Sequence, residues 1–346
     1  MSNPIAGGAF LALASAILFG FTTPLIQRWG VGLGVFGTAA LLYLGAALGT
    51  LFGAGRPGAE PRIGSGSWTR LVVVAVVGAA IAPSLLVFGL SRTPALGASL
   101  LLNLEAPLTL LGAWLLYREH LGGRVLAAAS LMGVAGALLA LEAARSGGSS
   151  SLLGTLAVAG AVTAWAADNA LTRPLADLDP VRVVRGKAAI GAAITGLVAV
   201  VRGEPAPGGT ALAALLLLGA SGYGASLRLY LLAQRRIGAA RTASLFAVAP
   251  FVGAALAYAL GDRALGAPGL AAALLFAIGA YLHLSERHAH AHAHPAIEHE
   301  HAHRHDDGHH DHGHDSYPAG SHSHPHRHSE TRHSHPHADD LHHRHH

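Results

Sequence analysis

The sequence contains no cysteine, a single lysine, and few charged or aromatic residues. Of its 346 residues, 12% are charged and 6% are aromatic, whereas 51% are hydrophobic. The lack of cysteine excludes disulfides, thiolate metal sites, iron–sulfur clusters and a cysteine nucleophile, so any bound metal needs imidazole or carboxylate ligands. Lys187 stands against twenty-two arginines, which together with the excess of Ala and Gly indicates a compositional bias. So little charge in so hydrophobic a chain argues against a soluble globular protein.

The charges divide the chain into two unlike parts. Residues 1–287 hold nineteen Arg and Lys against ten Asp and Glu. The remaining residues hold four Arg, nine acidic residues and 23 of the 25 histidines. We therefore expect a membrane core over residues 1–286 and a disordered, His-rich cytoplasmic tail over residues 287–346.

Long apolar segments make up most of the first part. A helix that spans a bilayer needs about 20 apolar residues, because its backbone must satisfy its own hydrogen bonds across about 30 Å of hydrocarbon. Ten segments meet this requirement, and the sequence predicts an all-α polytopic membrane protein. The predicted spans are residues 6–27, 31–53, 69–90, 94–117, 122–142, 152–172, 181–201, 211–233, 238–260 and 267–285.

The two halves of the core echo one another. The Ser/Gly stretch 145–151 is predicted to link a first five-helix repeat, residues 1–144, to a second, residues 152–286. Alignment of Pro107 with Pro250 also aligns Arg92 with Arg235, and the loops that carry these arginines differ in basic content. Five spans per half would place equivalent loops on opposite sides of the membrane. The sequence therefore predicts an inverted 5+5 repeat.

The distribution of basic residues predicts the orientation. With a cytoplasmic N-terminus, the inside loops and their flanks hold thirteen Arg and Lys, and the outside loops hold five. Cytoplasmic loops carry an excess of basic residues. We therefore expect an integral plasma (inner) membrane protein with both termini in the cytoplasm.

Polar residues inside the spans are the candidate substrate-binding residues. A charge at the bilayer centre costs about 2.5–3.5 kcal/mol on insertion scales, so an acid in a span suggests function. Glu105 is the leading candidate, with Asn103 before it and Pro107 after it, where a proline can kink the helix and free a carbonyl. The alternative is a structural Glu105 that is neutral or paired with another helix.

Three further groups of polar residues leave two interpretations open. Arg228 and Tyr230 would bind a substrate carboxylate, unless Arg228 extends to the interface. Asp168 and Asn169 would either line the pathway or clamp two helices together. Ser244 is the polar candidate of the ninth span, although a lone helical serine usually bonds its own backbone.

Several of these features together resemble a known family. They are the Leu104-Glu105-Ala106-Pro107 stretch, the Ala-Trp-Leu-Leu-Tyr-Arg-Glu run at 113–119, Trp165, and Ala249-Pro250. Over about residues 6–285 the sequence resembles the EamA-type branch of the drug/metabolite transporter superfamily. The resemblance implies a secondary transporter, often an exporter of amino acids or other metabolites. It also implies a central cavity lined mainly by the third, fourth, eighth and ninth spans.

The tail alternates histidine with other residues in several runs. Alternate residues of an extended chain project to one side, so two or three neutral imidazoles can converge on Zn, Ni, Co or Cu(II). A repeat expansion without a role, metal buffering or sensing, and pH sensing all remain open. Apolar residues are too few for a packed core. The predicted metal ligands are His288, His290, His292, His294, His299, His301, His303, His305, His322, His324, His326 and His328.

The function predicted from these features is transport of a small metabolite, regulated by divalent metal or pH through the tail. The alternatives are a divalent metal transporter for Ni, Co or Zn, and a non-transporting membrane scaffold or sensor. No helical His-x-x-x-His, Ser/His/Asp set or glycine-rich phosphate loop with lysine stands out, so we expect no enzyme. The expected partners are lipids, a small solute and metal ions at the tail, without nucleic acid or a required cofactor.

Overall fold

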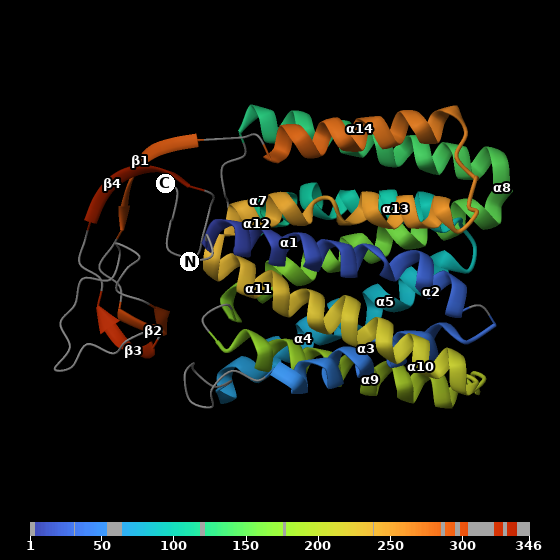
Figure 1. The fold of residues 1–346 in the computed structure, drawn as a ribbon, viewed down its shortest axis with the longest axis horizontal. Coiled ribbons are helices and arrows are strands. Elements are labelled where there is room, and N and C mark those ends of the chain that lie inside the picture. Colours follow the sequence, from blue (N-terminus) through green and yellow to red (C-terminus); the bar gives the residue numbers. More distant parts are fainter. Residues whose placement is uncertain are drawn as a thin grey trace.

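The core of the molecule is a bundle of helices that lie side by side. A computed structural model describes residues 4–30, 32–53, 64–117, 122–175, 178–237, 239–284, 288–294, 298–303, 322–327 and 331–337. The first helix begins and α14 ends at the same end of the bundle, where the tail also lies (Figure 1). Together with the apolar composition, this arrangement confirms the prediction of an all-helical membrane core.

Helices of the first half are interrupted at several points. Besides regular α-helix, the structure contains short 3-10 turns at Thr50–Gly53, Ser65–Ser67 and Leu102–Leu104, and a π-helical segment at Val76–Ile81. The α-helices are α1 (Pro4–Gly20), α2 (Thr22–Gly30), α3 (Val35–Gly49), α4 (Trp68–Ala75), α5 (Ala82–Leu90), α6 (Ala95–Leu101), α7 (Glu105–Tyr117) and α8 (Gly123–Thr172).

The second half has the same kinds of interruption. Its third apolar stretch contains a π-helical segment at Gly219–Ala225, and a 3-10 turn at Arg173–Leu175 follows α8. The α-helices are α9 (Pro180–Val201), α10 (Gly209–Leu218), α11 (Ser226–Ile237), α12 (Ala239–Phe246), α13 (Ala249–Ala259) and α14 (Ala267–Leu284).

Eight continuous helical stretches among the described residues are long and apolar enough to cross a membrane. Two shorter apolar helices, Val35–Gly49 and Ala267–His283, occupy the second and last of the predicted spans. The eight stretches are Ala6–Gly30, Trp68–Leu90, Ala95–Leu116, Gly123–Ser146, Gly148–Thr172, Val181–Val201, Gly209–Gln234 and Arg241–Ala259.

Residues 145–151, which the sequence predicted to be a linker, form part of helix α8. Helix α8 continues through them and breaks its helical geometry at Gly148, which has φ of 64°. A positive φ is readily adopted by glycine, because glycine lacks a Cβ. The two halves of the core are therefore joined at a single sharp break.

Small residues let the helices approach closely. A Cβ built on Gly89 of α5 would lie 2.8 Å from the carbonyl oxygen of Gly154 in α8, and one on Gly154 would lie 3.0 Å from that of Gly89. Close backbone approach of this kind is typical of helix packing in membranes. The pairs α3 with α9, α8 with α14, α6 with α13, and α1 with α11 pack along one another.

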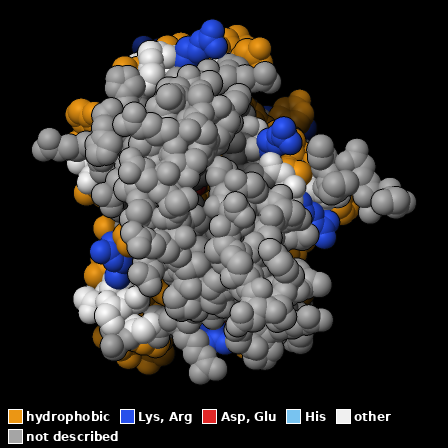
Figure 2. All heavy atoms as spheres, turned by 90° about the vertical axis from the view of Figure 1, so that its left-hand side faces the viewer, with side chains coloured by type: hydrophobic (Ala, Val, Ile, Leu, Met, Phe, Trp, Pro, Cys, Tyr) orange, Lys and Arg blue, Asp and Glu red, His pale blue; other side chains and the backbone are white. Residues whose placement is uncertain are grey.

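Large apolar side chains lie both inside and outside the bundle. Leu42, Leu100 and Phe276 are buried, whereas Val200 and Tyr281 are among those exposed on the outside. Figure 2 looks onto the end where the tail lies, and shows Lys and Arg side chains around its rim next to hydrophobic ones. An apolar outer surface with a basic rim fits contact with lipid.

The described parts of the tail form paired strands, where the sequence predicted disorder. Strand β1 (His288–His294) pairs with β4 (Thr331–His337), and β2 (Glu298–His303) pairs with β3 (His322–Arg327), both antiparallel. The alternation of histidine with small residues permits an extended backbone, and this extended form allows the pairing. A two-stranded ladder alone is only marginally stable in water, so the pairing supplies no packed core.

Candidate functional site

Glu105 lies at a break in the fourth apolar stretch. Pro107 has no backbone N–H, so the carbonyl of Asn103 cannot receive its usual helical hydrogen bond. The chain tightens into the turn Leu102–Leu104, and α7 then begins at Glu105.

The side chain of Asn103 forms a hydrogen bond within this turn. Its side-chain amide is buried and donates to the carbonyl of Leu100 at 2.9 Å. This bond stays within the turn, so the structure assigns Asn103 to local backbone support and does not bring it into contact with the other candidates.

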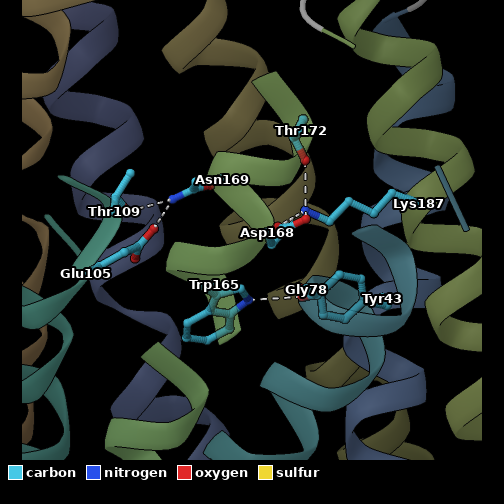
Figure 3. A network of polar contacts seen from close by, with 9 residues as sticks. All are labelled: Tyr43, Gly78, Glu105, Thr109, Trp165, Asp168, Asn169, Thr172 and Lys187. Carbon is cyan, nitrogen blue, oxygen red and sulfur yellow. Dashed lines mark hydrogen bonds and ion pairs between the residues drawn. The ribbon is translucent and has the colours of Figure 1, made fainter. Parts of the chain in front are cut away.

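Asn169 of α8 connects to Glu105. Its Nδ2 donates to Glu105 Oε1 at 2.9 Å and lies 3.5 Å from Thr109 Oγ1 (Figure 3). Two of the predicted polar residues, 64 positions apart in sequence, therefore meet between α7 and α8. The carboxylate of Glu105 faces a neutral donor.

Asp168 faces the other way and pairs with a residue that the sequence analysis missed. Lys187 of α9 donates to Asp168 Oδ2 in an ion pair, and the Thr172 hydroxyl donates to Asp168 Oδ1 at 3.3 Å. The Asp168 side chain is 3% exposed and that of Lys187 is 21% exposed. Lys187 was grouped with the basic residues that mark the cytoplasmic side, although it lies a full two turns inside α9. Its depth in an apolar helix was the signal that could have identified it.

A third contact fixes the π-helical segment Val76–Ile81 against α8. Ala82 N–H donates to Val77 O, and Pro83 has no N–H, so the carbonyl of Gly78 lacks both donors that would normally follow it in the helix. Trp165 Nε1 donates to this oxygen at 3.0 Å, and Tyr43 Oη donates to it at 2.8 Å. Buried carbonyls need such partners.

The same glycine also leaves room for the ion pair. A Cβ on Gly78 would collide with the carboxylate of Asp168. Gly78 thus permits Asp168 to lie against the π-helical segment while its carbonyl binds Tyr43 and Trp165 (Figure 3). Tyr43 was not a predicted site residue, and nothing in its local sequence distinguishes it.

The remaining predicted residues lie around this network. The Tyr230 ring meets that of Phe246 edge-on, with ring centroids 5.1 Å apart. Arg228 is exposed on α11, and Ser244 is half-buried on α12. The structure therefore brings Glu105 and Asn169 together, places Asp168 beside them on α8 in a separate ion pair, and leaves Arg228 at the surface.

The predicted metal ligands of the tail lie on its paired strands or outside the described residues. Among the described residues, no group of three or more His, Asp or Glu side chains is arranged to hold a metal ion. The backbone register places His299 opposite His326, and His301 opposite His324. His305 and His328 lie outside the described residues. The same strands, β2 and β3, also pair His303 with His322. In the ladder of β1 and β4, the pairs are His288 with His337, His290 with His335, and His292 with His333, whereas His294 pairs with Thr331.

Comparison with known proteins identifies relatives of the core. The sequence profile of the EamA-like transporter family matches residues 6–141 and again residues 152–285. A solved structure described as "Crystal structure of protein" has a TM-score of 0.58 and 22% identity, covering 80% of this chain and 94% of the other. A search of curated proteins gives no match. The structural likeness at this identity concerns the fold alone.

Proposed function

Because the chain belongs to the EamA-like transporter family, we propose that it is a secondary transporter, and specifically an exporter, of a small metabolite such as an amino acid or related solute. The observation that carries the proposal is the hydrogen bond between Glu105 and Asn169, beside the ion pair of Asp168 and Lys187, between helices of an apolar bundle. Ionisable residues in membrane spans are costly and usually mark a transport pathway. The family match supports transport as such, and the polar network supports this location for it.

Glu105 is the substrate ligand in this proposal. Its carboxylate already accepts one hydrogen bond from a neutral amide, Asn169, at 2.9 Å. An ammonium group of a solute would replace that amide with a charge-assisted bond, which is the stronger of the two. Asn169 would then be free to bond the solute through its own amide.

An inverted repeat of ten spans would supply the movement. Three features support it: the family profile matches each half, both halves have a π-helical segment in the third apolar stretch, and both break before a proline in the fourth. The α1 helix packs on α11 as α8 packs on α5, which is the relation expected between two equivalent halves. Inverted repeats typically bind substrate where the halves meet and rock around that site.

The proposed orientation places both termini in the cytoplasm of a plasma (inner) membrane protein. Basic residues at the starts of α4, α8 and α9 and around the junction of α11 with α12 lie at the end where α1 begins, and support this orientation through the positive-inside rule. Those described are Arg70, Arg124, Arg182, Arg185, Arg236 and Arg241.

The tail is proposed to regulate transport by binding a divalent metal such as Zn, Ni, Co or Cu(II). Alternate residues of paired strands share a face, so the register supports several histidines on one face of each ladder. Imidazole suits these ions. A chain that ends at Ser285 should then lose the response of transport to added Zn²⁺. An unchanged response would contradict this role.

The transport proposal is tested in proteoliposomes by counterflow of a mixture of radiolabelled amino acids. Glu105→Gln should lower counterflow at least about tenfold, the loss expected when about 1.4 kcal/mol of binding is removed. Glu142→Gln is the matched control, because Glu142 accepts a bond from Gly266 N–H in the connection between α13 and α14. Normal counterflow by Glu105→Gln would reject the site, and no counterflow by the unaltered protein across a broad metabolite panel would reject transport.

A further inference from the structure

The ion pair of Asp168 and Lys187 has no role in the proposed binding of substrate by Glu105. The two side chains belong to different helices, α8 and α9, and meet within the polar network. The carboxylate is almost fully buried, while about a fifth of the lysine side chain is exposed. Of the two, Lys187 is the less buried partner.

The lysine at this position is chemically distinct from the arginines of the chain. All other Lys and Arg positions, twenty-two of them, are arginine. An arginine stays protonated in proteins, whereas a lysine can release its proton when its surroundings disfavour the charge. The described basic neighbours on α9 are engaged elsewhere: Arg182 pairs with Asp179, and Arg185 bonds Thr50. The only lysine of the sequence thus occupies the buried ion pair.

We infer that Lys187 and Asp168 form a proton-carrying site of the proposed transporter, separate in role from Glu105. In one state Lys187 is an ammonium bound to the Asp168 carboxylate. In the other, Lys187 Nζ has given one proton to water and is a neutral amine, and the next proton taken from water restores the pair. Asp168 stays ionised throughout, with Thr172 donating to its other oxygen.

The surroundings of the pair determine its response to pH. Glu105 of α7 bonds Asn169, which follows Asp168 in α8, and Tyr43 of α3 bonds Gly78, against which Asp168 packs. A cationic solute at Glu105 would cancel a negative charge that favours the ammonium form of Lys187. Solute binding would therefore promote release of the proton, which is the coupling that exchange of a solute for a proton requires.

The single lysine makes this site directly measurable. An acylating reagent reacts with neutral amines. The amines of the chain are Lys187 and the N-terminal amine. In proteoliposomes, labelling of Lys187 followed by mass spectrometry should rise about tenfold per pH unit below its midpoint, as the neutral amine becomes more abundant. A Lys187 that stays unlabelled up to about pH 9 in the folded protein, but labels after denaturation, would show a permanently locked pair and overturn the inference.

Two variants test whether the Asp168 carboxylate, and not another carboxylate near α9, controls the protonation of Lys187. Asp168→Asn should speed labelling of Lys187 by about 10- to 1000-fold at neutral pH, because an adjacent opposite charge shifts protonation by that much. Asp179→Asn removes the carboxylate that pairs with Arg182 near the start of α9 and should leave the rate unchanged. Equal labelling of Lys187 in the unaltered protein and Asp168→Asn would also overturn the inference. The labelling experiment requires no transport, so its result can be interpreted even if the protein proves not to be a transporter.

The coupling itself is read with a pH-sensitive dye inside the same proteoliposomes. Addition of the amino-acid mixture should produce a proton signal that falls at least about tenfold in Lys187→Arg, because arginine retains its proton. Thermal unfolding of this variant in detergent is the control for its folding. A normal proton signal in Lys187→Arg would reject Lys187 as the carrier. Counterflow without any proton signal in the unaltered protein would reject the coupling while leaving the transport proposal intact.

Discussion

The two π-helical segments of the core share a backbone form and differ in what surrounds them. In Val76–Ile81, Gly78 packs against a carboxylate, and its carbonyl binds Tyr43 and Trp165. In Gly219–Ala225, a Cβ on Gly222 would meet the methyl group of Thr22. Charge and polar contacts gather at the first segment, and aliphatic and aromatic contacts at the second. Both halves therefore contain a π-helical segment, but only the segment of the first half packs against an ionised side chain.

Proline explains part of this difference. Residue 83 follows Gly78 by five positions, and as a proline it cannot donate the bond that a π-helical segment would use. The equivalent donor for Gly222 is Leu227, which has an N–H. The first segment therefore has a buried carbonyl that only side chains can satisfy, and those side chains come from α3 and α8.

The aromatic residues connect the two segments. Tyr43, which donates to Gly78, has its ring centroid 5.5 Å from that of Tyr223 in the second segment. Tyr223 in turn meets Phe19 edge-on, with centroids 5.9 Å apart. The tilted contact of Tyr43 with Tyr223 therefore packs one segment against the other.

Breaking the ion pair should have the largest effect on the first segment. Asp168→Ala leaves the Lys187 charge without its partner, and loss of one member of a buried pair costs about 3–5 kcal/mol. We expect the lower end of this range, because Lys187 is partly exposed. Thermal unfolding in detergent measures the change.

Replacement of both members distinguishes stability from function. The double variant Asp168→Leu with Lys187→Met removes both charges and should unfold near the temperature of the unaltered protein, since apolar replacement of a buried pair is often neutral or stabilising. Its proton signal should be absent. Equal destabilisation by the single and double variants would show that packing, and not charge, governs this segment.

Much of this architecture follows from hydrophobicity and proline position. The apolar stretches predict the helical core, and Pro107 predicts a break beside Glu105, which α7 confirms by beginning there. These features depend on neighbouring residues in the chain. The ion pair does not, because Asp168 and Lys187 meet only once α8 and α9 are packed.

The π-helical segments show where local sequence is insufficient. Gly78 and Pro83 are ordinary residues for a membrane helix, and either could be a tolerated bend. Only the packed structure shows that Tyr43 and Trp165 converge on the Gly78 carbonyl. The tail differs from the expectation for a related reason: apolar content predicts that no core forms, but does not exclude local pairing of extended strands.

Removal of the two donors to Gly78 should have an intermediate effect. Tyr43→Phe combined with Trp165→Phe leaves a buried carbonyl unsatisfied, which costs about 1–3 kcal/mol. Adding Pro83→Ala returns an N–H five residues after Gly78 and should recover part of the loss in thermal unfolding. No recovery would show that the side-chain donors act through packing and that the missing N–H is not the reason for them.

The smallest effect is expected at the junction beyond the second segment. Ser226 Oγ donates to the Ser15 carbonyl at 2.9 Å, and Ser15 Oγ donates to the Ser226 carbonyl at 2.7 Å. Ser226→Ala removes one of these bonds and keeps the other, so it should cost about 0.6 kcal/mol, the average for hydrogen bonds between membrane helices. Labelling of Lys187 and amino-acid counterflow should both stay unchanged, with Ser15→Ala as the reciprocal control. A loss as large as that of Asp168→Ala, or an altered Lys187 labelling rate, would mean that the two segments are energetically coupled through the aromatic contacts and that the proton-carrying site extends into both halves.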